Sequence, residues 1–302
     1  MGMGAADVVP GVSGGTIAFI TGIYEELVHA IRSLDGRAVR FFFTGKWRSF
    51  WKHINGAFLL AVFTGVLISV ISLAQILEHL LTTHPTLIWS FFFGLIVASS
   101  VIVARRIQSW NYTKVVALVA GVGTAFYITS ITPEQTTESA WFIFIAGALA
   151  SCAMILPGIS GSFILLLLGK YQYALNAVNE LELLPLLLLA LGAATGLISF
   201  AKLLSWLLKK YHDITVAVLA GFMIGSLNKI WPWKETISTI LIEGHEKPLL
   251  EKNIIPTPDD PSYQFWEAMA LMVAGIVLIA GIELLSRRMG NNPEANRTQG
   301  EP

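Results

Sequence analysis

Long apolar runs alternate with short polar segments along this chain, and their length is typical of membrane-spanning helices. A run of about 17 to 25 residues crosses a hydrocarbon core of about 30 Å as a helix. Six runs have this length, at residues 54–78, 86–104, 114–131, 185–208, 214–231 and 265–286. The pattern predicts a helical membrane protein without a large soluble domain.

Two further apolar segments are each interrupted by a Pro-Gly pair. They cover residues 1–31, with Pro10 and Gly11, and residues 141–178, with Pro157 and Gly158. As one straight helix the second segment would be about 57 Å long, nearly twice the thickness of the bilayer core. We therefore expect both segments to fold back as helical hairpins.

The two hairpins are copies of one motif. A shift of 147 residues places Pro10 on Pro157, PGVSG on PGISG and Tyr24 on Tyr171. Farther along the chain, other shifts align Gly65 with Gly196, Gly94 with Gly221, and Gly121 with Gly275. Because internal repeats reveal an architecture, we divide the chain into repeats at residues 1–131 and 141–286.

Each repeat consists of a hairpin followed by three helices. A hairpin returns the chain to its starting side and three crossings reverse it, so the second repeat is expected to lie upside down. The predicted fold class is therefore an all-α integral membrane protein with two inverted-topology repeats, the plan of many secondary transporters.

Loop charge agrees with this topology. Basic residues mark cytoplasmic loops, and the segments assigned to the cytoplasm hold most of them, at 32–53, 105–114, 209–210 and 287–297. The opposite side holds Lys234, Lys247 and Lys252 among many acidic residues. We expect cytoplasmic N- and C-termini, a cytoplasmic tail at residues 287–302, and a surface segment at residues 32–53 that lies on anionic lipid.

Composition narrows the class further. Apolar residues make up 54% of the chain and charged residues 13%, whereas soluble domains carry about a quarter of their residues charged. The net charge of zero argues against nucleic acid as a partner. The single cysteine, Cys152, excludes an internal disulfide framework, and no removable signal peptide is recognisable.

The Pro-Gly motif also indicates a kind of site. Proline and glycine end one helix, and Ser13 or Ser160 is a favoured N-cap for the next. The restarted helices would present backbone N–H groups that favour an anion; the residues concerned are Gly14, Gly15, Thr16, Gly161 and Ser162. We expect a central anion site where the two tips meet. The alternative is that these small residues only allow close helix packing.

Ionisable residues near the tips and span ends are further candidates. Asp7 lies three residues before Pro10, whereas its repeat mate is Met154; it is either a proton carrier or a hydrogen-bonded structural aspartate. Gate or headgroup-attracting roles are considered for Glu25, Glu26, Lys170, Arg105 and Arg106, with snorkelling or topology signals as the alternative. Snorkelling is also expected for Lys202, Lys229, Glu267 and Glu283.

Catalysis has little support in the sequence. All six histidines fall in loops or at span ends, so Ser13 and Ser160 have no evident base. No metal-protease, paired-cysteine or ATP-binding motif occurs. We expect no cofactor and no metal, and any transport would run on a gradient or on mass action.

A family resemblance adds to these expectations. The stretches GAADVVPGVSGGTIAFITGIYEELV, residues 4–28, and LPGISGSFILLLLGKY, residues 156–171, resemble the bacterial and archaeal polyprenyl phosphate translocases. The resemblance implies a cytoplasmic-membrane protein that returns undecaprenyl phosphate from the outer to the cytoplasmic leaflet. It also implies candidates for substrate handling, namely Asp7, Pro10, Gly11, Ser13, Gly14, Gly15, Thr16, Pro157, Gly158, Ser160 and Gly161.

The chain departs from that family at its beginning, and other functions stay open. Met1 corresponds to Ala148, inside the first arm of the second hairpin, so either the first arm is short or the start lies upstream. A polyprenyl diphosphate phosphatase has a similar motif, but with an arginine where this chain has Gly14 and Gly161. A carrier of small or organic anions could use the same helix ends.

The mechanism expected from the sequence is alternating access. The phosphate would sit at the paired tips, its prenyl tail would stay in lipid, and one repeat would rock against the other. Asp7 could couple this movement to a proton. The sequence leaves open the coupling ion, the net direction, the prenyl length and the oligomeric state.

Overall fold

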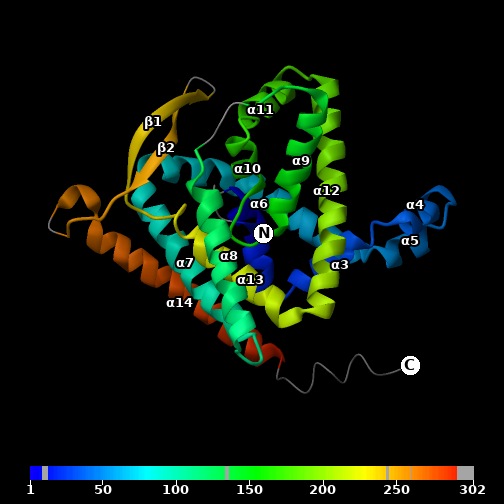
Figure 1. The fold of residues 1–302 in the computed structure, drawn as a ribbon, viewed down its shortest axis with the longest axis horizontal. Coiled ribbons are helices and arrows are strands. Elements are labelled where there is room, and N and C mark those ends of the chain that lie inside the picture. Colours follow the sequence, from blue (N-terminus) through cyan, green and yellow to red (C-terminus); the bar gives the residue numbers. More distant parts are fainter. Residues whose placement is uncertain (9–12, 133–135, 243–244, 259, 291–302) are drawn as a thin grey trace.

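The structure is a computed structural model that describes residues 1–8, 13–132, 136–242, 245–258 and 260–290. Pro10 and Gly11, two of the expected site residues, lie outside the described residues, as does most of the expected tail. Figure 1 shows a bundle of helices with a β-hairpin at one edge.

The first half of the chain forms eight helices. Their bounds are α1 Gly2–Val8, α2 Gly14–Ile20, α3 Tyr24–Arg32, α4 Gly36–Phe43, α5 Trp47–His53, α6 Gly56–Thr83, α7 Pro85–Arg105 and α8 Tyr112–Ser130. The first three lie where the sequence predicts the first hairpin, and α2 packs against both α1 and α3. Helices α4 and α5 project to one side of the bundle (Figure 1).

The second half repeats this order and adds a β-hairpin. Its elements are α9 Ala140–Ile155, α10 Gly161–Leu167, α11 Tyr171–Asn179, α12 Leu183–Lys210, α13 His212–Ser226, β1 Lys234–Ile242, β2 His245–Asn253, the 3-10 helix η1 Pro261–Tyr263, and α14 Phe265–Gly290. Strands β1 and β2 pair antiparallel.

The 147-residue repeat is visible in the element boundaries. Helices α10 and α11 begin and end 147 residues after α2 and α3. In both copies a glycine joins them at positive φ, Gly22 at 79° and Gly169 at 62°, a conformation that glycine adopts without steric cost. The long helices that follow, α6 and α12, both have 28 residues.

Two equivalent helix crossings hold the halves together. Helix α7 packs against α14, where a Cβ on Gly94 would lie 2.0 Å from the Met272 carbonyl oxygen. Helix α13 packs against α8, where a Cβ on Gly221 would lie 2.3 Å from the Leu118 carbonyl oxygen. Close backbone approach of this kind is typical of helix pairs in membranes. The third long helix of each half therefore packs on the second long helix of the other half.

The prediction of a mainly helical membrane protein is confirmed, with two differences. In the part of the chain that the structure describes, five helices, α6, α7, α8, α12 and α14, are long and apolar enough to span a membrane. The span predicted at 214–231 is the shorter helix α13, which ends at Ser226 before Trp231 and Pro232. Residues 234–242 and 245–253, which lie between two predicted spans, form the paired strands β1 and β2.

Candidate functional site

The tips of the two helical hairpins touch each other in the interior. The Ser13 hydroxyl donates to the Met154 carbonyl oxygen at 3.2 Å, and the Tyr24 hydroxyl donates to that of Ile155 at 3.1 Å. In the other direction, the Gly158 amide donates to Thr16 Oγ1 at 3.1 Å. Because buried hydrogen bonds are costly to leave unmade, these contacts fix the tips against each other.

The first tip already holds a carboxyl group. Ser13 caps α2 by accepting from the Gly15 amide at 3.1 Å, as the sequence predicts. One oxygen of Asp7 accepts from the Gly14 amide at 2.7 Å. Gly14, Gly15 and Thr16 are buried. The Asp7 side chain thus occupies the position that the sequence predicts for a bound anion.

The second tip differs because it lacks this carboxylate. Ser160 caps α10 by accepting from the Phe163 amide at 3.2 Å. Met154 stands where the first tip has Asp7, and its exposed fraction is 50%. Ser162 is also exposed. The Gly161 and Ser162 amides find no acceptor among the residues that the structure describes. The second tip is therefore the more accessible of the two.

The turn of the second tip packs closely on α13. Pro157 and Gly158 are buried, and Gly158 has a φ of 91°. A Cβ on Gly158 would lie 2.6 Å from the Ser226 hydroxyl oxygen. Both the close packing and the positive φ explain why glycine stands here.

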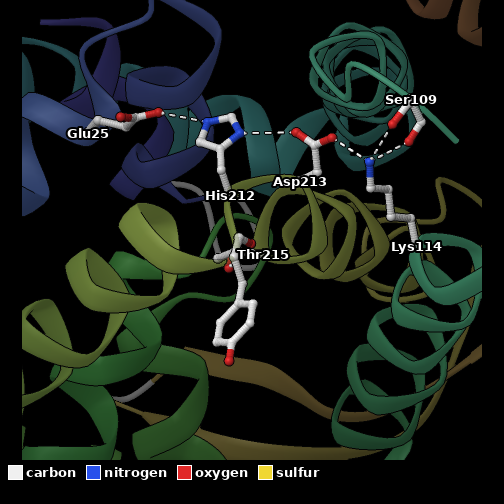
Figure 2. A network of polar contacts seen from close by, with 7 residues as sticks. Glu25, Ser109, Lys114, His212, Asp213 and Thr215 are labelled. Atoms are coloured by element: carbon white, nitrogen blue, oxygen red, sulfur yellow. Dashed lines mark hydrogen bonds and ion pairs between the residues drawn. The ribbon is translucent and has the colours of Figure 1, made fainter. Parts of the chain in front are cut away.

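Glu25, an expected gate residue, belongs to a polar network across three helices (Figure 2). His212 Nε2 lies 3.2 Å from Glu25 Oε1, and His212 Nδ1 lies 3.3 Å from Asp213 Oδ1. The other oxygen of Asp213 pairs with Lys114, whose ammonium also donates to Ser109. The network joins α3 and α8 of the first half to α13 of the second.

Sequence reasoning did not find His212, Asp213 and Lys114 as members of this network. His212 and Asp213 are adjacent in the sequence at the start of a predicted span, which was a weak signal for a cluster. Lys114 is 99 residues from Asp213. Only the packing of α8 on α13 brings the ammonium and the carboxylate together.

Three of the other four gate or headgroup candidates lie in different surroundings. Arg106 donates to the Ile20 carbonyl oxygen at 3.4 Å and lies over the Phe19 ring. Arg105 lines a shallow hollow of about 230 Å³ that Trp110 and Ser100 also line. Lys170 is only 2% exposed and donates to the Thr136 carbonyl oxygen at 2.7 Å. Burial of the Lys170 ammonium contradicts the snorkelling interpretation, since a snorkelling head reaches water.

A larger apolar hollow of about 440 Å³ lies between α9 and α12. Its lining includes Phe144, Ala148, Cys152, Phe200 and Leu203. Helix α9 leads from this hollow to Met154 and the second tip. The hollow therefore offers an apolar surface next to the accessible tip. Among the described residues, no group of three or more His, Cys, Asp or Glu side chains could hold a metal ion.

The fold and these sites define the class as a multi-pass helical membrane protein in which the start of α2 and the segment between α9 and α10 contact each other in the interior. The undecaprenyl phosphate translocase-like family matches residues 3–247, and the chain belongs to this family.

Two curated relatives carry the same name. A polyprenyl-phosphate transporter of Vibrio cholerae serotype O1 is 45% identical over 288 residues, which are 94% of each chain. A polyprenyl-phosphate transporter of Staphylococcus aureus is 36% identical over 76% of this chain and 83% of its own. No solved structure matches this chain. The family and the names of the relatives indicate a transporter rather than an enzyme.

Proposed function

We propose that this protein is a translocase of polyprenyl phosphate, and of undecaprenyl phosphate in particular, in a bacterial or archaeal cytoplasmic membrane. The observation that carries the proposal is the contact of two capped hairpin tips inside a member of this family. Helix breaks of this kind are tolerated at membrane depth only in protein or in a wet cavity. They are the places where transporters bind polar groups.

The phosphate sits at the paired tips, with the second tip as its main contact. The Gly161 and Ser162 amides have no acceptor there among the described residues, whereas the Gly14 amide at the first tip donates to Asp7. Helix ends and hydroxyl donors lower the large cost of taking a phosphate into hydrocarbon. The prenyl tail follows the apolar hollow between α9 and α12.

Movement between leaflets occurs by alternating access. The two repeats are inverted relative to each other and rock around the tips, which carries the lipid from the outer to the cytoplasmic leaflet. The network around His212 lies between the halves and closes the cytoplasmic side. Opening that side requires the network to separate.

The test is transbilayer movement of undecaprenyl phosphate in liposomes, with wild type, Ser162→Asp and the neutral control Ser162→Asn. A negative charge about 8 Å from the phosphate costs about 2 kcal/mol at an effective dielectric constant of about 20, or about thirtyfold in affinity. We expect Ser162→Asp to lose at least tenfold in rate and Ser162→Asn to stay within about twofold of wild type.

Three outcomes would overturn the proposal or part of it. Release of phosphate from undecaprenyl diphosphate by wild type would make the protein a phosphatase. Movement of small organic anions without any response to the lipid would make it an anion carrier. Equal rates of lipid movement for the Asp and Asn variants would show that the second tip does not contact the phosphate.

A further inference from the structure

A second polar cluster lies at the far end of α13 from His212. Helix α13 begins at His212 and ends at Ser226, so its 15 residues separate the two clusters by about 22 Å. Three side chains form the second cluster, Lys229 after α13, Lys234 of β1 and Glu251 of β2. The proposed topology places this cluster on the side opposite the cytoplasm.

The cluster has one carboxylate for two ammonium groups. Lys234 Nζ lies 3.2 Å and Lys229 Nζ lies 3.4 Å from the same oxygen of Glu251, Oε2. The Lys234 side chain is 6% exposed, that of Glu251 19% and that of Lys229 22%. Buried charges are normally paired. Among the side chains that the structure describes, this cluster holds two ammonium groups and one carboxylate in a place with little water.

An aromatic ring faces each of the two ammonium groups. Lys234 Nζ lies 4.4 Å from the centroid of the Trp89 ring, and Lys229 Nζ lies 5.3 Å from that of Phe163. Aromatic faces attract cations. Burial lowers the pKa of Lys234 to about 8, and Glu251 opposes this shift. Lys234 is therefore still mostly protonated at neutral pH.

The cluster is next to the second hairpin tip. Phe163, under the Lys229 ammonium, lies in the first turn of α10 and donates its amide to Ser160. The β-hairpin is attached to the segment after α13, because the side-chain amide of Asn253 donates to the backbone and side-chain oxygens of Asn228, both at 2.9 Å. The two lysines thus stand at the tip that lacks an internal carboxylate.

We infer that Lys229 and Lys234 bind the phosphate monoester of the transported lipid as it reaches the second tip, with Glu251 as the internal anion that the phosphate displaces. This inference rests on the proposed function and adds residues to it. The ligand is a phosphate with at least one oxygen facing both ammonium groups. An anion of this kind balances the excess charge that Glu251 alone leaves.

The test is binding of farnesyl phosphate and of inorganic phosphate to the full-length protein in detergent, by titration calorimetry. The variants are Lys229→Gln, Lys234→Gln and Glu251→Gln, with Lys202→Gln as control because Lys202 is an exposed lysine of α12. We expect each cluster lysine variant to weaken binding of farnesyl phosphate at least tenfold. Glu251→Gln is expected to strengthen it severalfold, and Lys202→Gln to leave it unchanged.

The opposite sign of the Glu251 variant distinguishes a binding site from a structural ion pair. Weaker or unchanged binding in Glu251→Gln, or unchanged binding in Lys229→Gln, would overturn the inference. If Lys234→Gln does not fold, Lys229→Gln decides, because its side chain is more exposed and its ion pair is longer. Inorganic phosphate that binds as tightly as farnesyl phosphate would assign the site to a water-borne phosphate and overturn the lipid assignment.

Failure of this inference is separable from failure of the proposed function. If the wild-type protein transports the lipid and the lysine variants bind farnesyl phosphate as wild type does, the translocase function stands and the lysine cluster has no part in binding. Conversely, the variants could change farnesyl phosphate binding as expected while the wild-type protein moves no lipid. That result would support the binding site and contradict the translocase function.

Discussion

Asp7 makes the two hairpin tips chemically different. Its carboxylate accepts from the Gly14 amide, and a Cβ on Gly14 would lie 2.5 Å from its Oδ2 atom. The equivalent Gly161 faces the Ala150 carbonyl oxygen and the Met154 side chain instead. One tip thus holds a carboxyl group next to its first amides, and the other does not.

A pair of substitutions separates capping from proton transfer at Asp7. Because an amide oxygen can still accept from Gly14, Asp7→Asn is expected to cost about 1 kcal/mol of stability and Asp7→Leu about 1–3 kcal/mol. We expect Asp7→Asn to retain at least half of the wild-type transport rate. Thermal unfolding in detergent and the liposome assay measure the two effects; a stable Asn variant without transport would make Asp7 a proton carrier.

At the level of elements, the glycine crossings decide how closely the halves approach. A Cβ on Gly121 of α8 would lie 2.4 Å from the Val218 carbonyl oxygen, whereas one on Gly123 of the same helix meets nothing within 4 Å. Backbone atoms cannot move aside as a flexible side chain can. The Gly121 position therefore admits no larger residue without separation of α8 and α13.

Substitution of these two glycines tests the crossing with a matched control. We expect Gly121→Ala to destabilise the protein by about 1–3 kcal/mol through overpacking. Gly123→Ala is expected to be neutral or to stabilise by up to about 1 kcal/mol, because alanine favours a helix. Thermal unfolding of both variants measures this difference; equal effects would mean that α8 and α13 are not in close contact.

Sequence patterns predicted the elements that depend on local chemistry. Pro-Gly breaks, serine N-caps and small residues at fixed spacing are local signals, and they indicated the hairpins, Ser13, Ser160 and Gly121. The β1–β2 hairpin was missed because a short two-stranded ribbon takes its stability from its surroundings. The Lys114–Asp213 pair and the Lys229–Glu251 pair depend on helix packing, which no local pattern specifies.

At the scale of the molecule, the His212 network and the lysine cluster lie at opposite ends of α13. The network joins both halves through pairs of unequal burial. Water screens the charges of an exposed ion pair more strongly than those of a less exposed one. Lys114 and Asp213 are largely buried, and Glu25 is exposed.

Removal of Lys114 is expected to loosen the contact between the two halves more than removal of the Glu25 charge. Lys114→Ala should increase hydrogen exchange at the start of α13 strongly, Glu25→Gln should increase it slightly in α3, and Glu26→Gln serves as the control. Glu26 is exposed and lies outside the network, with Asn55 as its partner. Unchanged exchange and unchanged transport in Lys114→Ala would remove the network from gating.

The exchange of helices between the halves has a consequence for biosynthesis. Helix α7 emerges from the ribosome early, but its partner α14 begins only at Phe265. Until then, the face around Gly94 has no docked helix and stays open to lipid or to a chaperone. The first half of this protein therefore completes its fold only when nearly the whole chain has been made.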